Sequence, residues 1–328
     1  MIKVDIFSGF LGAGKTTLIK KLVEEAYKGE KIVLIENEFG EIGIDGGFLK
    51  DAGIEINEMN SGCICCSLVG DFGKALQQVI EEFNPERILI EPSGVGKLSD
   101  IIDAVRNLEL EEVELNGFTT VVDAKKAKIY MKNFGEFFNN QIENASSIIL
   151  SHTQTLTEEK LAKVVELIRE HNENAVLITT DWDALDGKQI LAAMERRDTI
   201  EETLAHMEHE HHEHHRHHDH EEGCCCGGHH DHHHHHADEV FESIGVETTK
   251  KFTPEAIQQA LEALEDEHAY GFVLRAKGIV EGQDGKWIHF DYVPGEPDVR
   301  LGNAEVMGRL CIIGSKMNKD AVRELFEI

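Results

Sequence analysis

The feature that most constrains this chain is the segment Gly9-Phe-Leu-Gly-Ala-Gly-Lys-Thr16, which matches the pattern Gly-x-x-x-x-Gly-Lys-Thr. A short apolar run, Ile2-Lys-Val-Asp-Ile-Phe7, precedes it, and a segment with helical spacing follows it. Strand, glycine-rich turn and helix in this order are the context that a phosphate-binding loop requires. The glycines let backbone N–H groups turn toward an anion, and the helix N-terminus adds a favourable dipole. The sequence therefore predicts a nucleoside triphosphate site.

Within this site, Lys15 would reach the β- and γ-phosphates and the Thr16 hydroxyl would hold Mg²⁺. A second apolar run, Arg87-Ile-Leu-Ile-Glu91, ends in an acid, which is the usual place for a carboxylate that serves Mg²⁺. Gly94 follows and would bring its N–H near the γ-phosphate. Lys15, Thr16 and Glu91 are thus the predicted catalytic residues. The predicted phosphate-binding residues are Gly9, Gly12, Ala13, Gly14, Lys15, Thr16, Thr17 and Gly94.

Three cysteines cluster in Asn60-Ser-Gly-Cys-Ile-Cys-Cys-Ser67, between an alternating segment and a segment with helical spacing. A turn at a helix N-terminus lowers the pKa of a thiol and favours the thiolate, which is the form that binds metal. Cys63, Cys65 and Cys66 could converge on a soft ion such as Zn²⁺ or Cu⁺, and Co²⁺ and Ni²⁺ are further candidates. The alternative is that some of these cysteines are buried apolar residues.

The acidic, glycine-containing segment Glu36-Asn-Glu-Phe-Gly-Glu-Ile-Gly-Ile-Asp45 follows the second expected strand. In folds with a phosphate-binding loop, a switch segment that responds to the γ-phosphate lies at this position. A solvated connection is the alternative interpretation, but it does not require so many carboxylates beside glycine-flanked apolar residues.

Residues 206–236 contain 16 of the 20 histidines, three consecutive cysteines and almost no apolar residues. Such a segment cannot form a core, and its imidazoles and thiols favour capture of several Zn, Ni, Co or Cu ions. The alternative is a neutral spacer. Clustered cysteines, unlike a disulfide framework, indicate a reducing compartment, so we expect a cytoplasmic protein. The predicted ligands in this tract include His211, His212, His214, His215, Cys224, Cys225 and Cys226.

Strands alternate with helices over the first ~200 residues, which predicts an α/β fold with a doubly wound, mostly parallel sheet. A small α+β domain follows, in which Thr253 and Asn318 are expected helix caps and no catalytic constellation is evident. We expect domains at 1–200 and 239–328, joined by a His/Cys-rich, disordered metal-binding linker at 201–238. The net charge of −30 argues against nucleic acid or an anionic membrane as partner, and no apolar run is long enough to span a bilayer.

The motifs Gly-Phe-Leu-Gly-Ala-Gly-Lys-Thr-Thr, Glu-Asn-Glu-Phe-Gly-Glu, Gly-Cys-Ile-Cys-Cys and Glu-Pro-Ser-Gly together resemble those of the CobW family of P-loop GTPases, relatives of the HypB and UreG nickel-delivery GTPases. The segment 271–278 resembles the family's C-terminal domain. The resemblance implies a GTP-driven metallochaperone or insertase that delivers Zn²⁺ or Co²⁺, with Ni²⁺ as a further candidate, to a client metalloprotein. It also implies that Glu36 and Glu41 assist the cysteines.

One segment departs from the family pattern. Ser151-His-Thr-Gln154 stands where members usually carry Asn/Thr-Lys-x-Asp, whose Asp accepts two hydrogen bonds from guanine. Gln154 offers one acceptor oxygen and could equally donate to adenine, so His152 and Gln154 are predicted base-contacting residues of open specificity.

Three other functions stay open: a metal-storage protein with a vestigial NTPase, a dedicated activator of one metalloenzyme (of the corrinoid or nitrile hydratase type), and a thiol-redox protein. Nucleotide- or metal-dependent dimerisation is also open.

Overall fold

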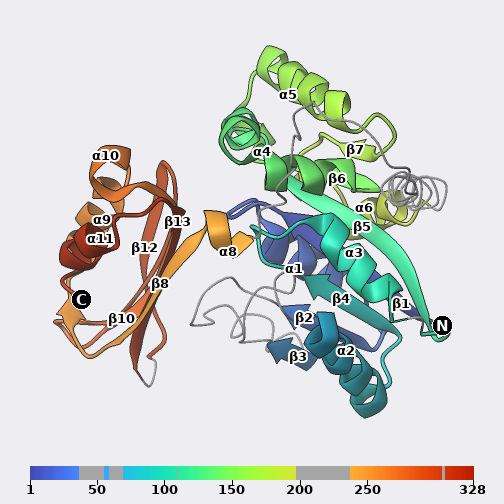
Figure 1. The fold of residues 1–328 in the computed structure, drawn as a ribbon, viewed down its shortest axis with the longest axis horizontal. Coiled ribbons are helices and arrows are strands. Elements are labelled where there is room, and N and C mark those ends of the chain that lie inside the picture. The colour runs from blue at the N-terminus through green and yellow to red at the C-terminus, as the bar shows by residue number, and fades with distance from the viewer. Residues whose placement is uncertain (37–54, 59–68, 109, 197–236, 305–306) are drawn as a thin grey trace, which may run out of the picture.

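The computed structural model describes residues 1–36, 55–58, 69–108, 110–196, 237–304 and 307–328. Two sheets organise these residues, and they lie in two units side by side (Figure 1). The first sheet has seven strands in the order β3-β2-β4-β1-β5-β6-β7, and all its pairings are parallel. The second sheet has six strands and is antiparallel except where β9 pairs with β10. The predicted fold class is confirmed.

The first unit follows the alternation expected from the sequence. Its strands are β1 (Ile2–Gly9), β2 (Ile32–Glu36), β3 (Glu55–Glu58), β4 (Arg87–Glu91), β5 (Val113–Asp123), β6 (Ser147–Ser151) and β7 (Val176–Ile178). Its helices are α1 (Lys15–Glu25), α2 (Val69–Phe83), α3 (Leu98–Arg106), α4 (Ala127–Glu143), α5 (Glu158–His171) and α6 (Gly187–Met194), with short 3₁₀ turns at Thr153–Thr155 and Trp182–Ala184.

Helices cover both faces of the parallel sheet. Leu18 and Leu22 of α1 and Ile190 of α6 pack with the strand residues of one face, whereas α2 to α5 contribute to the cluster on the other face. Because helices bury both faces of the sheet, the central strands consist of continuous apolar residues and do not alternate between apolar and polar ones. In the described part of the chain, no helix is long and apolar enough to cross a bilayer.

The second unit packs helices against one face of its antiparallel sheet. The strands are β8 (Glu242–Thr248), β9 (Lys251–Phe252), β10 (Phe272–Gly282), β11 (Trp287–Val293), β12 (Glu296–Gly302) and β13 (Gly308–Ser315). The helices are α8 (Ala237–Val240), α9 (Pro254–Ala263), α10 (Glu267–Tyr270) and α11 (Lys319–Phe326). Thr253 and Asn318 accept hydrogen bonds from Ala256 N (3.1 Å) and Ala321 N (3.3 Å), which confirms both predicted caps.

Edge strand β12 was not expected from the sequence. Its residues, Glu-Pro-Asp-Val-Arg-Leu-Gly, contain a proline and mostly polar side chains, which are typical of an edge that pairs on one side only. The strand pairs with β11 along the margin of the sheet.

The two units share an aromatic and aliphatic contact. Helices α9 to α11 lie on the side of the second sheet away from the first unit (Figure 1). From the opposite face, Leu274 and Ile279 join the core cluster of the first unit. Phe241 packs on Phe134 and Phe137 of α4 with ring centroids 5.5 and 5.1 Å apart. Cys311 is 4% exposed and belongs to this shared cluster.

Candidate functional site

The loop between β1 and α1 is shaped by two glycines with left-handed backbone angles. Gly12 has φ 72° and Gly14 has φ 100°, and Gly14 is the N-cap of α1. Side chains at these positions would be strained by the backbone angle. They would also meet neighbours, because a Cβ on Gly14 would lie 2.8 Å from the Trp182 ring. The loop therefore closes tightly onto the first turn of α1, whose N–H groups lack intrahelical partners.

The side chains that follow the loop fit a magnesium triphosphate. Lys15 is 6% exposed, and its ammonium donates a 2.9 Å hydrogen bond to the carbonyl oxygen of Gly9. The Thr16 hydroxyl donates to the Glu91 carboxylate, 2.9 Å from Oε1 and 3.2 Å from Oε2. A hydroxyl and a carboxylate side by side at a helix N-terminus, beside a buried lysine, form the donor set expected for Mg²⁺ and phosphate oxygens.

A cavity of about 610 Å³ opens over this loop. The first unit lines it with Gly12, Gly14, Lys15, Thr16, Thr17, Glu91, Ser151, His152, Gln154, Asp181 and Trp182. The second unit lines it with Arg275, Lys277, Asp291, Val293, Glu296, Pro297, Asp298 and Arg300. The volume falls within the range of small-molecule and cofactor sites.

The predicted base-contacting residues lie in the same cavity. His152 has a left-handed φ of 56° at the turn after β6, and Gln154 is exposed in the following 3₁₀ turn. Trp182 and Asp181, in the loop after β7, line the cavity as well. Sequence reasoning missed Trp182, although an aromatic residue in the loop after an apolar run could have suggested it.

The remaining predicted residues divide into two groups. Gly94 lies against the loop, because a Cβ on it would be 2.9 Å from Leu11 N. Gly9, Ala13 and Gly94 do not line the cavity. A second group lies outside the described residues: Glu41, Cys63, Cys65, Cys66 and the tract with His211, His212, His214, His215, Cys224, Cys225 and Cys226. Within the ranges that the structure does describe, no group of three metal-ligating side chains is present.

Glu36, predicted to assist the cysteines, ends β2, and its position pairs with Glu91 at the end of β4. On β3, Glu58 pairs in turn with Glu36. Since neighbouring strands lie about 4.8 Å apart, three acidic positions follow one another along the carboxyl edge of the sheet.

The second unit also contributes charged side chains to the cavity. Arg275 Nη2 lies 3.4 Å and Lys277 Nζ lies 4.0 Å from Oδ2 of Asp291. Glu296 Oε1 lies 3.3 Å from Lys125 Nζ of the first unit. Burial raises the pKa of Glu296, but Lys126, His152 and Lys125 together outweigh it, so this pKa lies below its usual range. The sequence analysis predicted no catalytic residues in this unit, because its residues are far from the phosphate-binding loop in the sequence.

Two family models match the chain. The model described as "CobW/HypB/UreG, nucleotide-binding domain" matches residues 3–179, and the "Cobalamin synthesis protein cobW C-terminal domain" model matches residues 241–328. Together they cover both units of the fold.

Individual relatives match over shorter stretches. The chain is 29% identical over 202 residues to "Zinc chaperone YeiR" of Escherichia coli K12, covering 61% of each chain. It is 41% identical over 131 residues to "Zinc chaperone CobW" of a Sinorhizobium species, covering 38% of this chain and 37% of the relative. Less than two thirds of either relative is therefore matched. A crystal structure of Zn(II)-bound YjiA GTPase from Escherichia coli is 22% identical with a TM-score of 0.43, covering 99% of this chain and 98% of that one.

Proposed function

The chain belongs to the CobW/HypB/UreG family of nucleotide-binding proteins, and on that premise we propose that it is a GTP-hydrolysing metallochaperone. It would bind a transition metal at Cys63, Cys65 and Cys66 and deliver it to a client metalloprotein. Zn²⁺ is the first candidate, because the relatives YeiR and CobW are named zinc chaperones, and Co²⁺ and Ni²⁺ are the next. Thiolate-rich sites suit all three ions.

The observation that carries this proposal is a row of acidic positions that leads from the nucleotide cavity to β3, the strand that comes before the cysteine segment in the sequence. Thr16 bonds to Glu91, Glu91 pairs in register with Glu36, and Glu36 pairs with Glu58 on β3. The Cys-x-Cys-Cys motif begins at Cys63, five residues after Glu58. A change at the Mg²⁺ end of this row would therefore reach the strand that precedes the predicted metal site in the sequence.

The roles of the nucleotide residues follow from their chemistry. Lys15 and the N–H groups of the loop would bind the phosphates, and Thr16 with Glu91 would hold Mg²⁺. When bound, Mg²⁺ would neutralise charge that develops on the β- and γ-phosphate oxygens. With triphosphate present, the segment after Glu36 would close around both sites, and after hydrolysis it would relax and release the metal.

Hydrolysis would be useful because tight metal sites release their ion slowly. Structural Zn²⁺ sites reach roughly 10–16 kcal/mol of binding free energy. Shifting such a site between a tight and a loose state needs a nucleotide-dependent difference of several kcal/mol. The histidine tract would act as a local metal reservoir for the cysteines.

The test is Zn²⁺ affinity measured with a non-hydrolysable GTP analogue and with GDP, each with Mg²⁺. We expect the two affinities to differ by roughly a hundredfold or more, equivalent to at least ~2.7 kcal/mol. Combined Cys63→Ala, Cys65→Ala and Cys66→Ala should abolish the difference, whereas Cys311→Ala, a buried cysteine outside the motif, should preserve it. Equal affinities in both nucleotide states would overturn the coupling and leave metal storage as the better function.

A deletion tests whether the histidine tract and the cysteine site have separate roles. Removing residues 206–236 should lower the number of bound metal ions while GTP hydrolysis stays near the wild-type rate. Loss of hydrolysis on deletion would contradict the assignment of the tract as an accessory reservoir.

A further inference from the structure

The loop between β4 and α3, residues 92–97, is held by a buried side chain of helix α4. Gln141 is 0% exposed, and its Nε2 donates to the carbonyl oxygens of Gly96 at 2.8 Å and Gly94 at 3.2 Å. The reverse orientation of the amide would point its oxygen at two carbonyl oxygens, so its donors must face the loop. Thr120 of β5 donates in turn to the backbone carbonyl oxygen of Gln141. Gln141 therefore connects the sheet and α4 directly to the backbone of this loop.

The loop starts directly after Glu91, the carboxylate that accepts the hydrogen bond of Thr16. Gly94, the first carbonyl that the amide binds along the chain, is the third residue after Glu91. Between them, the backbone N of Gly96 donates to the carbonyl oxygen of Ser93 at 3.1 Å, which closes a tight turn. Because the connection is short and turned, a shift of the bound carbonyl groups also shifts the end of β4 and its carboxylate.

The loop also packs on the phosphate-binding loop. A Cβ on Gly94 would lie 2.9 Å from the backbone N of Leu11 and 2.9 Å from its Cδ2. The residues from Pro92 to Gly96 are all buried. Contact with the phosphate-binding loop and hydrogen bonds from α4 therefore hold the loop together.

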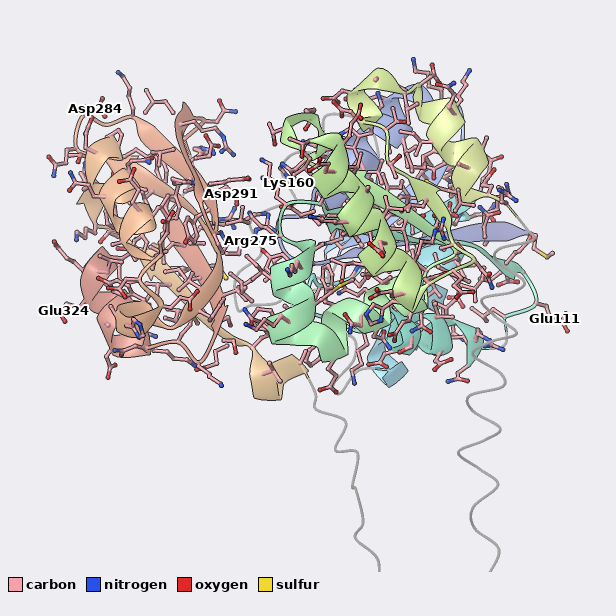
Figure 2. The ribbon with its side chains drawn as sticks, turned by 90° about the horizontal axis from the view of Figure 1, so that it is seen from above. Glu111, Lys160, Arg275, Asp284, Asp291 and Glu324 are labelled. Atoms are coloured by element: carbon pink, nitrogen blue, oxygen red, sulfur yellow. The ribbon has the colours of Figure 1, made fainter. Side chains whose placement is uncertain are left out.

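Helix α4 lies where the two units meet. Its Phe137 packs on Phe241 with ring centroids 5.1 Å apart. Figure 2 shows Arg275 and Asp291 on the side of the second unit that faces the first, and Glu324 on its far side. The helix that carries the amide is therefore supported by both units.

We propose that Gln141 is a positioning residue for the Mg²⁺ end of the nucleotide site: its amide holds residues 92–97 so that Glu91 stays beside Thr16. Gln141 does not line the cavity, so it acts through the loop. Its buried Oε1 has no hydrogen-bond partner among the described residues, which has a cost that an apolar side chain would avoid. What the amide contributes is thus its two donors. The inference rests on the proposed function only in that Thr16 and Glu91 serve the Mg²⁺ of a bound nucleoside triphosphate.

A purely structural amide makes a different prediction from a positioning amide. If Gln141 only stabilises the fold, removing its donors lowers stability and changes nucleotide binding equally with and without Mg²⁺. If it positions Glu91, the loss of affinity arises only with Mg²⁺, because Lys15 and the N–H groups of the phosphate-binding loop bind phosphate without that carboxylate.

The experiment measures binding of a non-hydrolysable GTP analogue to the full-length chain, once with Mg²⁺ and once with EDTA. Gln141→Met keeps the approximate length of the side chain and removes both donors. The gain in affinity that Mg²⁺ provides should fall about tenfold, since displacing a positioned group by an ångström costs up to ~100-fold. Affinity in EDTA should match that of the wild type. Gln141→Asn, whose amide is one methylene shorter, should reduce the Mg²⁺ gain in the same direction.

Asn172→Ala is the matched control. The Asn172 amide also donates to backbone carbonyl oxygens near the end of α4, those of Ile142 at 2.8 Å and Ala145 at 2.9 Å, instead of those of residues 92–97. The variant should lose stability in urea unfolding and keep the full Mg²⁺ gain.

Three results would overturn this inference: an unchanged Mg²⁺ gain in Gln141→Met, an equal loss of affinity with and without Mg²⁺, or the same loss of Mg²⁺ gain in Asn172→Ala. If Gln141→Met fails to fold, Gln141→Asn decides by the same criteria. A wild-type chain whose affinity does not rise with Mg²⁺ would overturn the inference together with the nucleotide part of the proposed function. Equal Zn²⁺ affinity in both nucleotide states would remove metal delivery alone and leave the effect of Gln141→Met in place.

Discussion

Val293 occupies the space beside Gly12 that any side chain at position 12 would need, because a Cβ there would lie 2.3 Å from Val293 Cγ1. Gly12 belongs to the phosphate-binding loop of the first unit and Val293 to the end of β11 in the second. The conformation of the loop and the docking of the second sheet are therefore coupled through one contact.

Gly12→Ala should weaken nucleotide binding by roughly tenfold or more. The φ of 72° costs an L-residue about 1–2 kcal/mol, and the new methyl group must also displace Val293 or the loop. Titration with a fluorescent GTP analogue measures the loss. Gly29→Ala is the matched control, since Gly29 has φ 89° but nothing within 4 Å of an added Cβ. Equal effects of the two variants on binding would show that steric contact with Val293 is unimportant.

Gln154→Asp should increase the preference for GTP over ATP by roughly tenfold. A carboxylate accepts from both the N1–H and the exocyclic amine of guanine, and a hydrogen bond to a charged group contributes ~1.5–3 kcal/mol. Competition of GTP and ATP for the same site measures the preference. Gln259→Asp, an exposed position on α9, should leave it unchanged. An unchanged preference in Gln154→Asp would mean that another residue reads the base.

Arg87→Ala should lower the free energy of unfolding by ~3–5 kcal/mol, because it leaves the buried carboxylate of Asp5 without its cation. The Arg87 guanidinium pairs with Asp5, with Glu30 at 2.7 Å and with Glu195 at 3.0 Å, and the side chain is 2% exposed. Urea unfolding provides the measurement.

A second ion pair provides the comparison for Arg87. Lys251→Ala removes an exposed pair with Glu281 and should cost no more than ~1 kcal/mol. Similar losses in the two variants would contradict a special role for burial at Arg87.

The contact between Glu296 and Lys125 should weaken in acid. The pKa of Glu296 is lower in the folded protein than its ordinary value of 4.5. The carboxylate therefore stabilises the fold fully at pH values above 4.5. That contribution is lost as the pH falls through the lower, folded pKa. The melting temperature of Glu296→Gln should therefore lie below that of the wild type at pH 7 and approach it as the pH falls through the lowered pKa of Glu296. A constant difference between the two proteins across this range would exclude titration of Glu296 as the cause.

Many elements of both units could be predicted with useful accuracy because their signals are local. Gly14 at a helix start, the apolar run before Glu91, and the caps Thr253 and Asn318 each depend on neighbours within a few residues. Element ends were less accurate. The strand β5, for example, begins at Val113, but its first three residues are only half buried and lack a continuous apolar pattern, so its start carries little signal in the sequence.

The sequence by itself determined that this chain has a loop of the phosphate-binding pattern, a strand that ends in an acid beside it and a doubly wound sheet, since spacing and residue type specify these features locally. Only the tertiary structure decided that Arg275, Lys277 and Val293 face that loop. Their position depends on the docking of a second sheet through Phe241 and its aromatic neighbours, and on edge strand β12, whose polar sequence carries little strand signal. Contacts between residues far apart in the chain arise from the packing of whole faces, which local periodicity does not encode.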